Sequence, residues 1–144
     1  MKRISIPTYR FGAVATAIGV NDQTLRNWLF RGKDLDLFTE RPPGGWRAFE
    51  ERDVWVLAMV VEFMRFGSTI NEAVDAARQA MGLSNPRTLE GVPLYLYSAP
   101  RPDGWVVNED KGLVLEVSGC PSVLEIPMQQ VLSSAVMRLT AQTA

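Results

Sequence analysis

Apolar positions in the first part of the chain recur at helical spacing, and they predict two short helices joined by a turn. The first helix is expected over residues 12–18 and ends at Gly19, a residue suited to a left-handed turn. Asn21 is then a suitable N-cap for a second helix that extends to about residue 30. The second helix has an apolar stripe at i, i+3, i+4 spacing, formed by Leu25, Trp28 and Leu29. This arrangement is typical of a helix-turn-helix, although any corner between two short helices has the same pattern.

Residues 38–49 lack helical periodicity and contain a strong turn signal, the run Pro-Pro-Gly-Gly at 42–45. Short alternating runs flank this turn on both sides. We therefore expect a small β-hairpin, the wing, between the second and the third helix.

A third helix is expected over residues 50–66, and it carries two apolar stripes instead of one. One stripe consists of Val54, Leu57, Ala58, Val61 and Met64, and the other of Val56, Val60 and Phe63 with Trp55, Met59 and Phe66 beside them. A helix that is apolar around most of its circumference must be covered on more than one side. Either the C-terminal segment or a second subunit is expected to provide the additional cover. Thr69 and Glu72 then form a capping box for a fourth helix, which ends at Gly82.

After about residue 84 the helical spacing gives way to short runs that favour strands. Strands are expected at 92–97, 105–107, 113–117 and 122–126, with a turn at 100–104, a hairpin loop at 108–112 and a last helix at 128–139. The predicted fold class is α+β: an N-terminal winged helix-turn-helix of four helices with a β wing, then a small antiparallel β-sheet and a C-terminal helix. We expect two domains, residues 7–82 and residues 90–144.

The chain has 144 residues and a net charge of −1, but the charge is unevenly distributed. Residues 1–50 hold eight basic and five acidic side chains, which gives +3, whereas residues 51–144 hold seven and eleven, which gives −4. The basic end can therefore face a phosphate backbone while the acidic end points away. The chain has no run of 18 apolar residues and no signal-peptide pattern, so we expect a cytoplasmic protein without a membrane segment.

The residue types exclude several kinds of chemistry. Cys120 is the only cysteine, and the chain has no histidine. A zinc cluster, an intramolecular disulfide and a Ser-His-Asp or Cys-His catalytic centre therefore cannot be built. We expect no enzyme activity, no metal and no cofactor.

Four segments of the N-terminal half carry motifs of a known family, in the order and with the spacing of that family. They are 9–15 (YRFGAVA), 19–28 (GVNDQTLRNW), 45–54 (GWRAFEERDV) and 66–73 (FGSTINEA). Their shared features are an Ala, a Gly-Val pair, Thr-Leu-Arg followed by an aromatic residue, and Gly-aromatic-Arg-x-aromatic. With these motifs, about half of the chain resembles the DNA-binding domain of MerR-family transcription regulators.

The resemblance implies a set of DNA contacts. Arg26 would lie on the recognition helix in the major groove, and Trp46 and Arg47 would lie at the wing and contact phosphates. An arginine suits this role because its planar fork of N–H donors can grip phosphate or the edge of guanine. The complete predicted DNA-binding set is Asn21, Gln23, Thr24, Arg26, Asn27, Arg31, Trp46 and Arg47.

The sequence also departs from the family. Members usually continue into a long helix that forms a dimer coiled coil, but no such heptad run follows residue 82, and one cysteine is too few for metal sensing. We therefore expect a DNA-binding transcription regulator that contacts double-stranded DNA as a homodimer, with the C-terminal segment 90–144 serving for dimerisation or for docking a protein partner. Two alternatives stay open: a phage-type architectural DNA protein, such as an excisionase or a packaging subunit, and a protein-interaction module that does not bind DNA.

Overall fold

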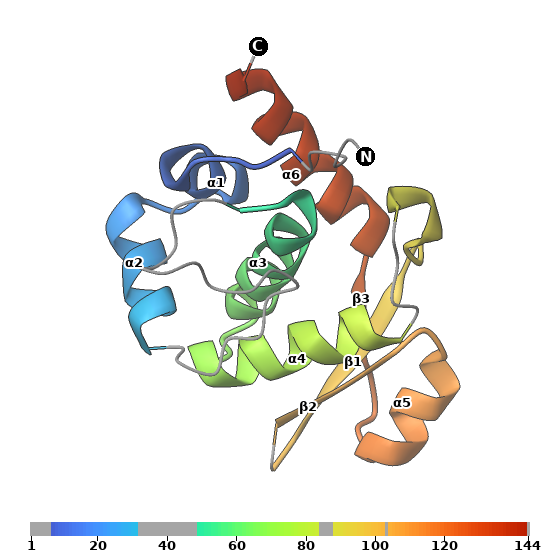
Figure 1. The fold of residues 1–144 in the computed structure, drawn as a ribbon. Helices are drawn as coiled ribbons and strands as arrows, with labels where there is room; N and C mark the ends of the chain where they lie inside the picture. The colour runs from blue at the N-terminus through green and yellow to red at the C-terminus, as the bar shows by residue number, and fades with distance from the viewer. Residues whose placement is uncertain (1–6, 32–48, 84–87, 103, 144) are drawn as a thin grey trace, which may run out of the picture.

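Two short helices and the turn between them form the N-terminal part of the fold. The computed structural model describes residues 7–31, 49–83, 88–102 and 104–143. α1 (Phe11–Ile18) and α2 (Asp22–Arg31) are joined at Gly19, whose φ of 81° lies in the left-handed region that suits glycine (Figure 1). The Oδ1 atom of Asn21 accepts a hydrogen bond from the Thr24 amide at 2.7 Å, so Asn21 caps α2 as predicted. The expected pair of helices is confirmed.

α3 (Glu51–Arg65) is the central helix, and it is buried on almost every side (Figure 1). Its buried residues are Asp53, Val54, Trp55, Val56, Leu57, Ala58, Met59, Val60 and Phe63. At its start, the carboxylate of Asp53 accepts a hydrogen bond from the Glu50 amide at 2.9 Å, which satisfies an N–H group that the helix cannot pair. α4 (Ile70–Gly82) follows and packs along α3.

α6 (Met128–Thr143) covers the second apolar side of α3 within the same chain, because it packs against both α1 and α3. Its fully buried residues are Met128, Leu132, Ala135 and Leu139. Two hydrogen bonds attach it to carbonyl groups of α1: Arg138 Nε donates to Ala17 at 2.6 Å, and Gln142 Nε2 donates to Ala13 at 3.1 Å. Of the two expected sources of cover for α3, the structure thus shows the C-terminal segment.

A three-stranded antiparallel sheet of order β2-β1-β3 lies beside α4. Its strands are β1 (Leu96–Arg101), β2 (Gly104–Asn108) and β3 (Leu124–Ile126), and the 3-10 turn η1 (Leu89–Gly91) precedes them. Trp105 reaches from β2 to α3, where its ring lies 6.1 Å from that of Phe63. The small antiparallel sheet and the closing helix agree with the predicted α+β fold.

One predicted strand is wrong, because residues 111–118 form a helix, α5 (Lys111–Ser118). Its apolar run Leu-Val-Leu at 113–115 is too short for periodicity to distinguish a strand from a helix. The deciding feature is Asp110, whose side chain accepts a hydrogen bond from the Leu113 amide at 3.2 Å and so caps the helix. The segment 108–112 is therefore the beginning of α5 and not the loop of a hairpin.

The first strand also lies later in the sequence than predicted. Residues 100 and 101, expected in a turn, still pair with β2, so the turn at this end is shorter than the predicted 100–104. Pro100 is tolerated in the central strand because β3 pairs with β1 only as far as Ser98. Beyond that point, the missing N–H of Pro100 deprives no neighbouring strand of a hydrogen bond.

The outer edge of β2 is closed by one side chain of α4. The Nε2 atom of Gln79 donates to the carbonyl of Trp105 at 2.8 Å, and its Oε1 atom accepts from the amide of Val107 at 3.3 Å. The side-chain amide thus takes one outward-facing main-chain group of each of these two residues. An open edge strand is a template for unwanted pairing, and Gln79 covers part of that edge here.

The buried apolar side chains of the helices and of the sheet form one continuous cluster. It includes residues from both ends of the chain, such as Val14 and Leu25 in the N-terminal helices and Leu96, Ile126 and Leu139 in the C-terminal segment. Among the residues that the structure describes, no helix has the length and the apolar character needed to cross a membrane.

The hydrogen bonds of Gln79 lead to a prediction about stability. Replacing Gln79 with Leu keeps the size of the side chain but leaves the Trp105 carbonyl and the Val107 amide without their partner. We expect a loss of about 1–3 kcal/mol in the free energy of unfolding, measured by urea denaturation. Hydrogen exchange of the Val107 amide should become faster at the same time.

Gln142→Leu serves as the matched control, because Gln142 also makes two hydrogen bonds to main-chain carbonyls but lies at an exposed position where water can replace it. This variant should lose much less stability. A Gln79→Leu protein as stable as the wild type, with unchanged exchange at Val107, would contradict the assigned role.

Candidate nucleic-acid interface

α2 presents a polar face to solvent, and its apolar stripe holds the helix on the core. Leu25 and Leu29 are buried, whereas Gln23, Arg26 and Asn27 are exposed. On this face Gln23 Nε2 donates to Asn27 Oδ1 at 3.0 Å, one turn later along the helix. This hydrogen bond uses one donor of Gln23 and one acceptor of Asn27, and each side-chain amide has further donor and acceptor positions that another molecule can use.

A groove runs along one side of α2, between this helix and the beginning of α4. Its lining residues are Thr24, Asn27, Trp28, Met64, Thr69 and Ile70. Thr24 is half-buried in the groove wall, and Trp28 packs against the apolar core with its inner side. Of the predicted set, Thr24 and Asn27 thus line this groove.

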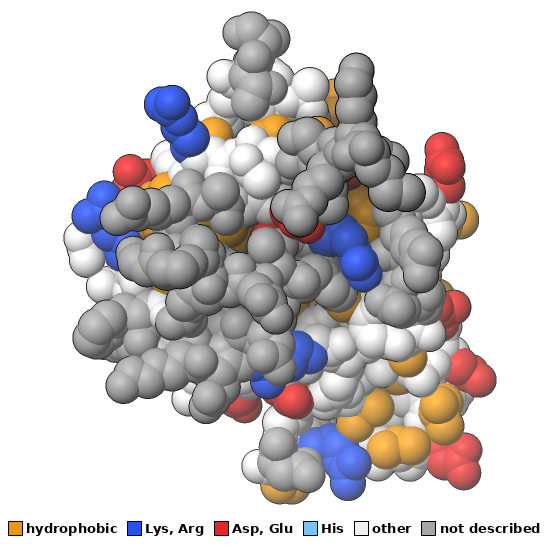
Figure 2. All heavy atoms as spheres, in the orientation of Figure 1, with side chains coloured by type: hydrophobic (Ala, Val, Ile, Leu, Met, Phe, Trp, Pro, Cys, Tyr) orange, Lys and Arg blue, Asp and Glu red, His pale blue; other side chains and the backbone are white. Residues whose placement is uncertain are grey.

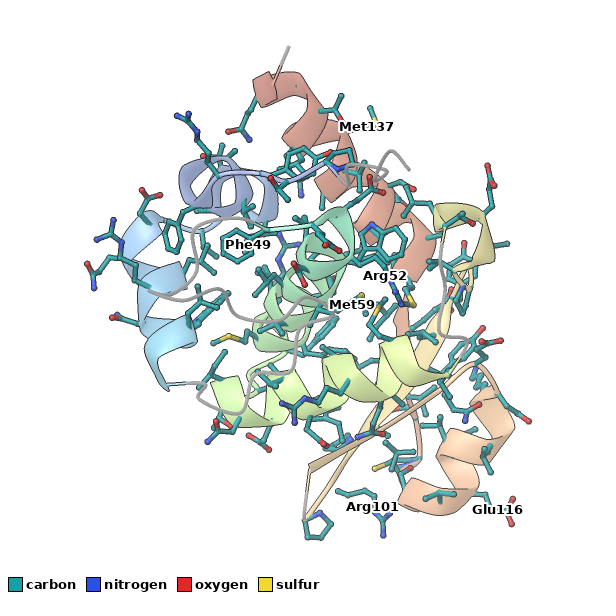
Figure 3. All side chains as sticks on the ribbon, in the orientation of Figure 1. Phe49, Arg52, Met59, Arg101, Glu116 and Met137 are labelled. Atoms are coloured by element: carbon teal, nitrogen blue, oxygen red, sulfur yellow. The ribbon has the colours of Figure 1, made fainter. Side chains whose placement is uncertain are left out.

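Arg26 lies on the opposite flank of α2, beside α1. Its guanidinium carbon lies 5.4 Å from the centre of the Phe11 ring, which is a cation–π arrangement. The ring of Phe11 in turn packs against Phe49, at 6.2 Å between ring centres. Phe49 is fully buried, and two backbone hydrogen bonds join it to Tyr9, at 2.7 and 2.9 Å. Figure 3 shows Phe49 enclosed between α1, α2 and α3.

The other predicted contacts are placed less completely. Asn21 is exposed at the start of α2, and its Oδ1 atom is used for the cap, so its amide N–H groups remain for a ligand. Arg31 is the last residue of α2, and its side chain lies outside the described part of the structure. Trp46, Arg47 and the predicted wing up to residue 48 also lie outside the described residues.

The sequence did not reveal the aromatic support of Arg26. Tyr9, Phe11 and Phe49 belong to the motifs that carry the family resemblance, but their contacts with each other join positions far apart in the chain. Local periodicity carries no information about such a contact. The only available signal was the presence of aromatic residues at the start of α1 and after the expected wing.

The first turn of α4 borders the groove, and a complete capping box holds it. Thr69 Oγ1 accepts from the Glu72 amide at 3.2 Å, and the Thr69 amide donates to Glu72 Oε1 at 3.0 Å. The hydrogen bond from the backbone of Thr69, and then the one from its side chain, lower the pKa of Glu72 below its usual value. The predicted capping box is confirmed.

Charge is distributed unevenly over the surface. Acidic side chains follow the edge formed by η1 and α5 in Figure 2, and Glu116, labelled in Figure 3, is one of them. On the side of α1 and α2, the exposed residues of the described part include the cations Arg10 and Arg26 and one acid, Asp22, in the first turn of α2. The acidic edge therefore lies away from the polar face of α2, which favours approach of a polyanion from the α2 side.

Comparison with known families gives one match. The model of a family described as MerR HTH family regulatory protein matches residues 9–80, which is half of the 144-residue chain. The match spans α1, α2, α3 and most of α4. Among curated proteins, no similar sequence is found.

The capping box of α4 yields a prediction about pH. Because the pKa of Glu72 is lower in the folded protein than in the unfolded chain, its carboxylate stabilises the fold at every pH above its unfolded value near 4.5. This contribution is lost as the pH falls through the lower, folded pKa. In thermal unfolding between pH 3 and pH 6, the variant Glu72→Gln should therefore approach the stability of the wild type toward acid pH.

Thr69→Ala removes the other half of the capping box, and it should lower the free energy of unfolding by about 1 kcal/mol at neutral pH.

Glu116→Gln is the control for the pH series, because Glu116 lies in the last turn of α5 and not at a helix start. Its difference from the wild type should not follow the pattern of Glu72→Gln. If the difference in stability between Glu72→Gln and the wild type stays constant over the whole acid range, the ionisation of Glu72 does not stabilise the fold as predicted.

Proposed function

The chain belongs to the MerR HTH regulatory family, a family of DNA-binding regulators, and we propose that it regulates transcription by placing α2 in the major groove of double-stranded DNA. The observation that carries this proposal is the exposed polar face of α2 within the matched segment. In helix-turn-helix proteins the second helix enters the groove while the first crosses the backbone. α1 and α2 have the order and the connection that this geometry requires.

Each side chain on α2 has chemistry suited to the groove. Gln23 and Asn27 carry amide groups, which pair with the donor and acceptor of adenine. Arg26 can bind guanine or phosphate with its in-plane donors, and Thr24 and Asn21 can contact the backbone at the start of the helix. We assign the wing residues Trp46 and Arg47, together with Arg31, to phosphate contacts on the strength of the family resemblance.

The charge distribution supports this orientation. The whole chain carries a net charge of −1, so attraction to DNA depends on which face is presented. With α2 toward the DNA, the acidic edge at η1 and α5 is directed away from the phosphates (Figure 2). The exposed cations Arg10 and Arg26 then lie toward the duplex.

We propose that the protein binds DNA as a homodimer through the C-terminal segment 90–144. Of the seven large apolar side chains exposed in the described residues, five lie in this segment: Leu94, Tyr95, Leu113, Val117 and Met137. A symmetric dimer would fit two half-sites of a palindrome.

Light scattering on a sizing column should give twice the chain mass of 16.0 kDa. A monomer at micromolar concentration would reject the dimer and leave the proposal of DNA binding unaffected.

Substitution of Arg26 tests the interface. Arg26→Ala should weaken binding to a selected DNA site by about 1–3 kcal/mol, or about fivefold to more than a hundredfold, because a bidentate contact is lost. The measurement is a fluorescence anisotropy titration at several salt concentrations. If Arg26 contacts phosphate, the log–log salt slope should also decrease by about one; if it contacts a base, the slope should stay.

Arg101→Ala is the matched control, since it removes the same charge from an exposed position at the end of β1, far from α2 (Figure 3). Its affinity for DNA should stay close to that of the wild type. A wild-type protein that binds no DNA even at low salt would reject the proposed function. Equal losses in both variants would reject the assignment of α2 as the contact helix.

A further inference from the structure

We propose that Phe11 is a positioning residue for DNA recognition: its ring holds the guanidinium of Arg26 in the orientation that binds DNA. This inference rests on the proposed function, and it adds a residue that does not itself contact the major groove of the DNA. The observation behind it is the 5.4 Å separation between the guanidinium carbon of Arg26 and the centre of the Phe11 ring. At this distance the ring quadrupole attracts the cation.

The geometry matters because Arg26 has another available partner. Asp22 lies one turn earlier on the same face of α2, at the i−4 position where a carboxylate commonly pairs with an arginine. The structure describes both residues and shows no salt bridge between them. The guanidinium is directed toward α1 instead.

The two kinds of contact leave different groups free. A salt bridge would use the N–H edge of Arg26 and neutralise its charge. The cation–π contact with Phe11 involves the charge of the guanidinium and no oxygen acceptor, so N–H donors of Arg26 remain for phosphate or for the O6 and N7 atoms of guanine. The ring therefore restricts the motion of a long side chain without occupying its binding groups, which lowers the ordering cost of binding.

The support for Phe11 is itself firm. Its ring packs at 6.2 Å and at a tilted angle of 53° against Phe49, which is fully buried. Phe49 is fixed by the two backbone hydrogen bonds to Tyr9, two residues before Phe11. A chain of contacts thus runs from the core through Phe49 and Phe11 to Arg26, and it ends on the exposed face of the recognition helix.

The experiment compares Phe11→Leu with Phe11→Tyr in the full-length protein, with DNA affinity measured by anisotropy on a selected site. Leu keeps an apolar side chain but removes the ring, and we expect binding about two- to fivefold weaker. Tyr keeps the ring and should restore wild-type affinity. In an Arg26→Ala background the Phe11→Leu change should have no further effect, because the cation–π contact no longer exists.

A second series keeps the shape of the side chain and so avoids any loss of folding. Phenylalanine analogues with one, two or three fluorine atoms at position 11 withdraw electron density from the ring face by increasing amounts. DNA affinity should fall stepwise along this series. In the free protein, the ring-current shift of the Arg26 Nε–H signal in NMR should show that the guanidinium lies near the Phe11 ring.

The outcomes separate this inference from the function on which it rests. If the wild type binds no DNA, both are rejected. If it binds and the fluorinated series gives constant affinity, Phe11 has no electrostatic role and only the positioning role is rejected. Stronger DNA binding by Phe11→Leu would mean that the ring withdraws Arg26 from DNA. If Phe11→Leu weakens DNA binding equally in the wild type and in the Arg26→Ala background, Phe11 acts independently of Arg26. Either result overturns the proposal.

Discussion

The fold depends on the burial of α3 on nearly all of its sides. A helix with two apolar stripes cannot be stable when only one layer covers it, so further elements have to pack around it. α1 and α4 supply part of the cover, α6 supplies another part, and Trp105 of β2 reaches the ring of Phe63. The helix-turn-helix and the sheet are therefore attached to a common core. The exposed face of α2 keeps its position because Leu25 and Leu29 are anchored in that core.

The elements that the sequence predicted well are those whose signals are local. The N-cap Asn21, the capping box of Thr69 and Glu72 and the doubly apolar α3 all depend on residues a few positions apart, and the structure has each of them. The sequence predicts a strand where α5 lies, because three apolar residues in a row fit a strand as well as a buried helix, and the cap made by Asp110 decides for the helix. The start and end of β1 depend on its partners, which the chain brings together only in the folded state.

The candidate interface was predictable only in part, for the same reason. The polar residues of α2 follow from periodicity, and they lie within the segment that the family model matches. The support under Arg26 does not follow, because Phe11 and Phe49 meet through tertiary packing. The Gln79 contact with β2 is of the same type: nothing in the sequence near a helical glutamine shows that it replaces a strand. Residues that act through tertiary contacts are thus harder to identify from the sequence than residues on the exposed face of a helix.

The attachment of α6 to α1 also determines when the protein can complete its folding during synthesis. α1 and α3 emerge early during synthesis, but the helix that covers them, with Arg138 bonded to the carbonyl of Ala17, is made much later. Until then the second apolar side of α3 stays open to water and to other apolar surfaces, a state prone to aggregation. The helix-turn-helix part therefore completes its core only after translation has passed α6, and a nascent chain interrupted before that point carries α2 on an unfinished support.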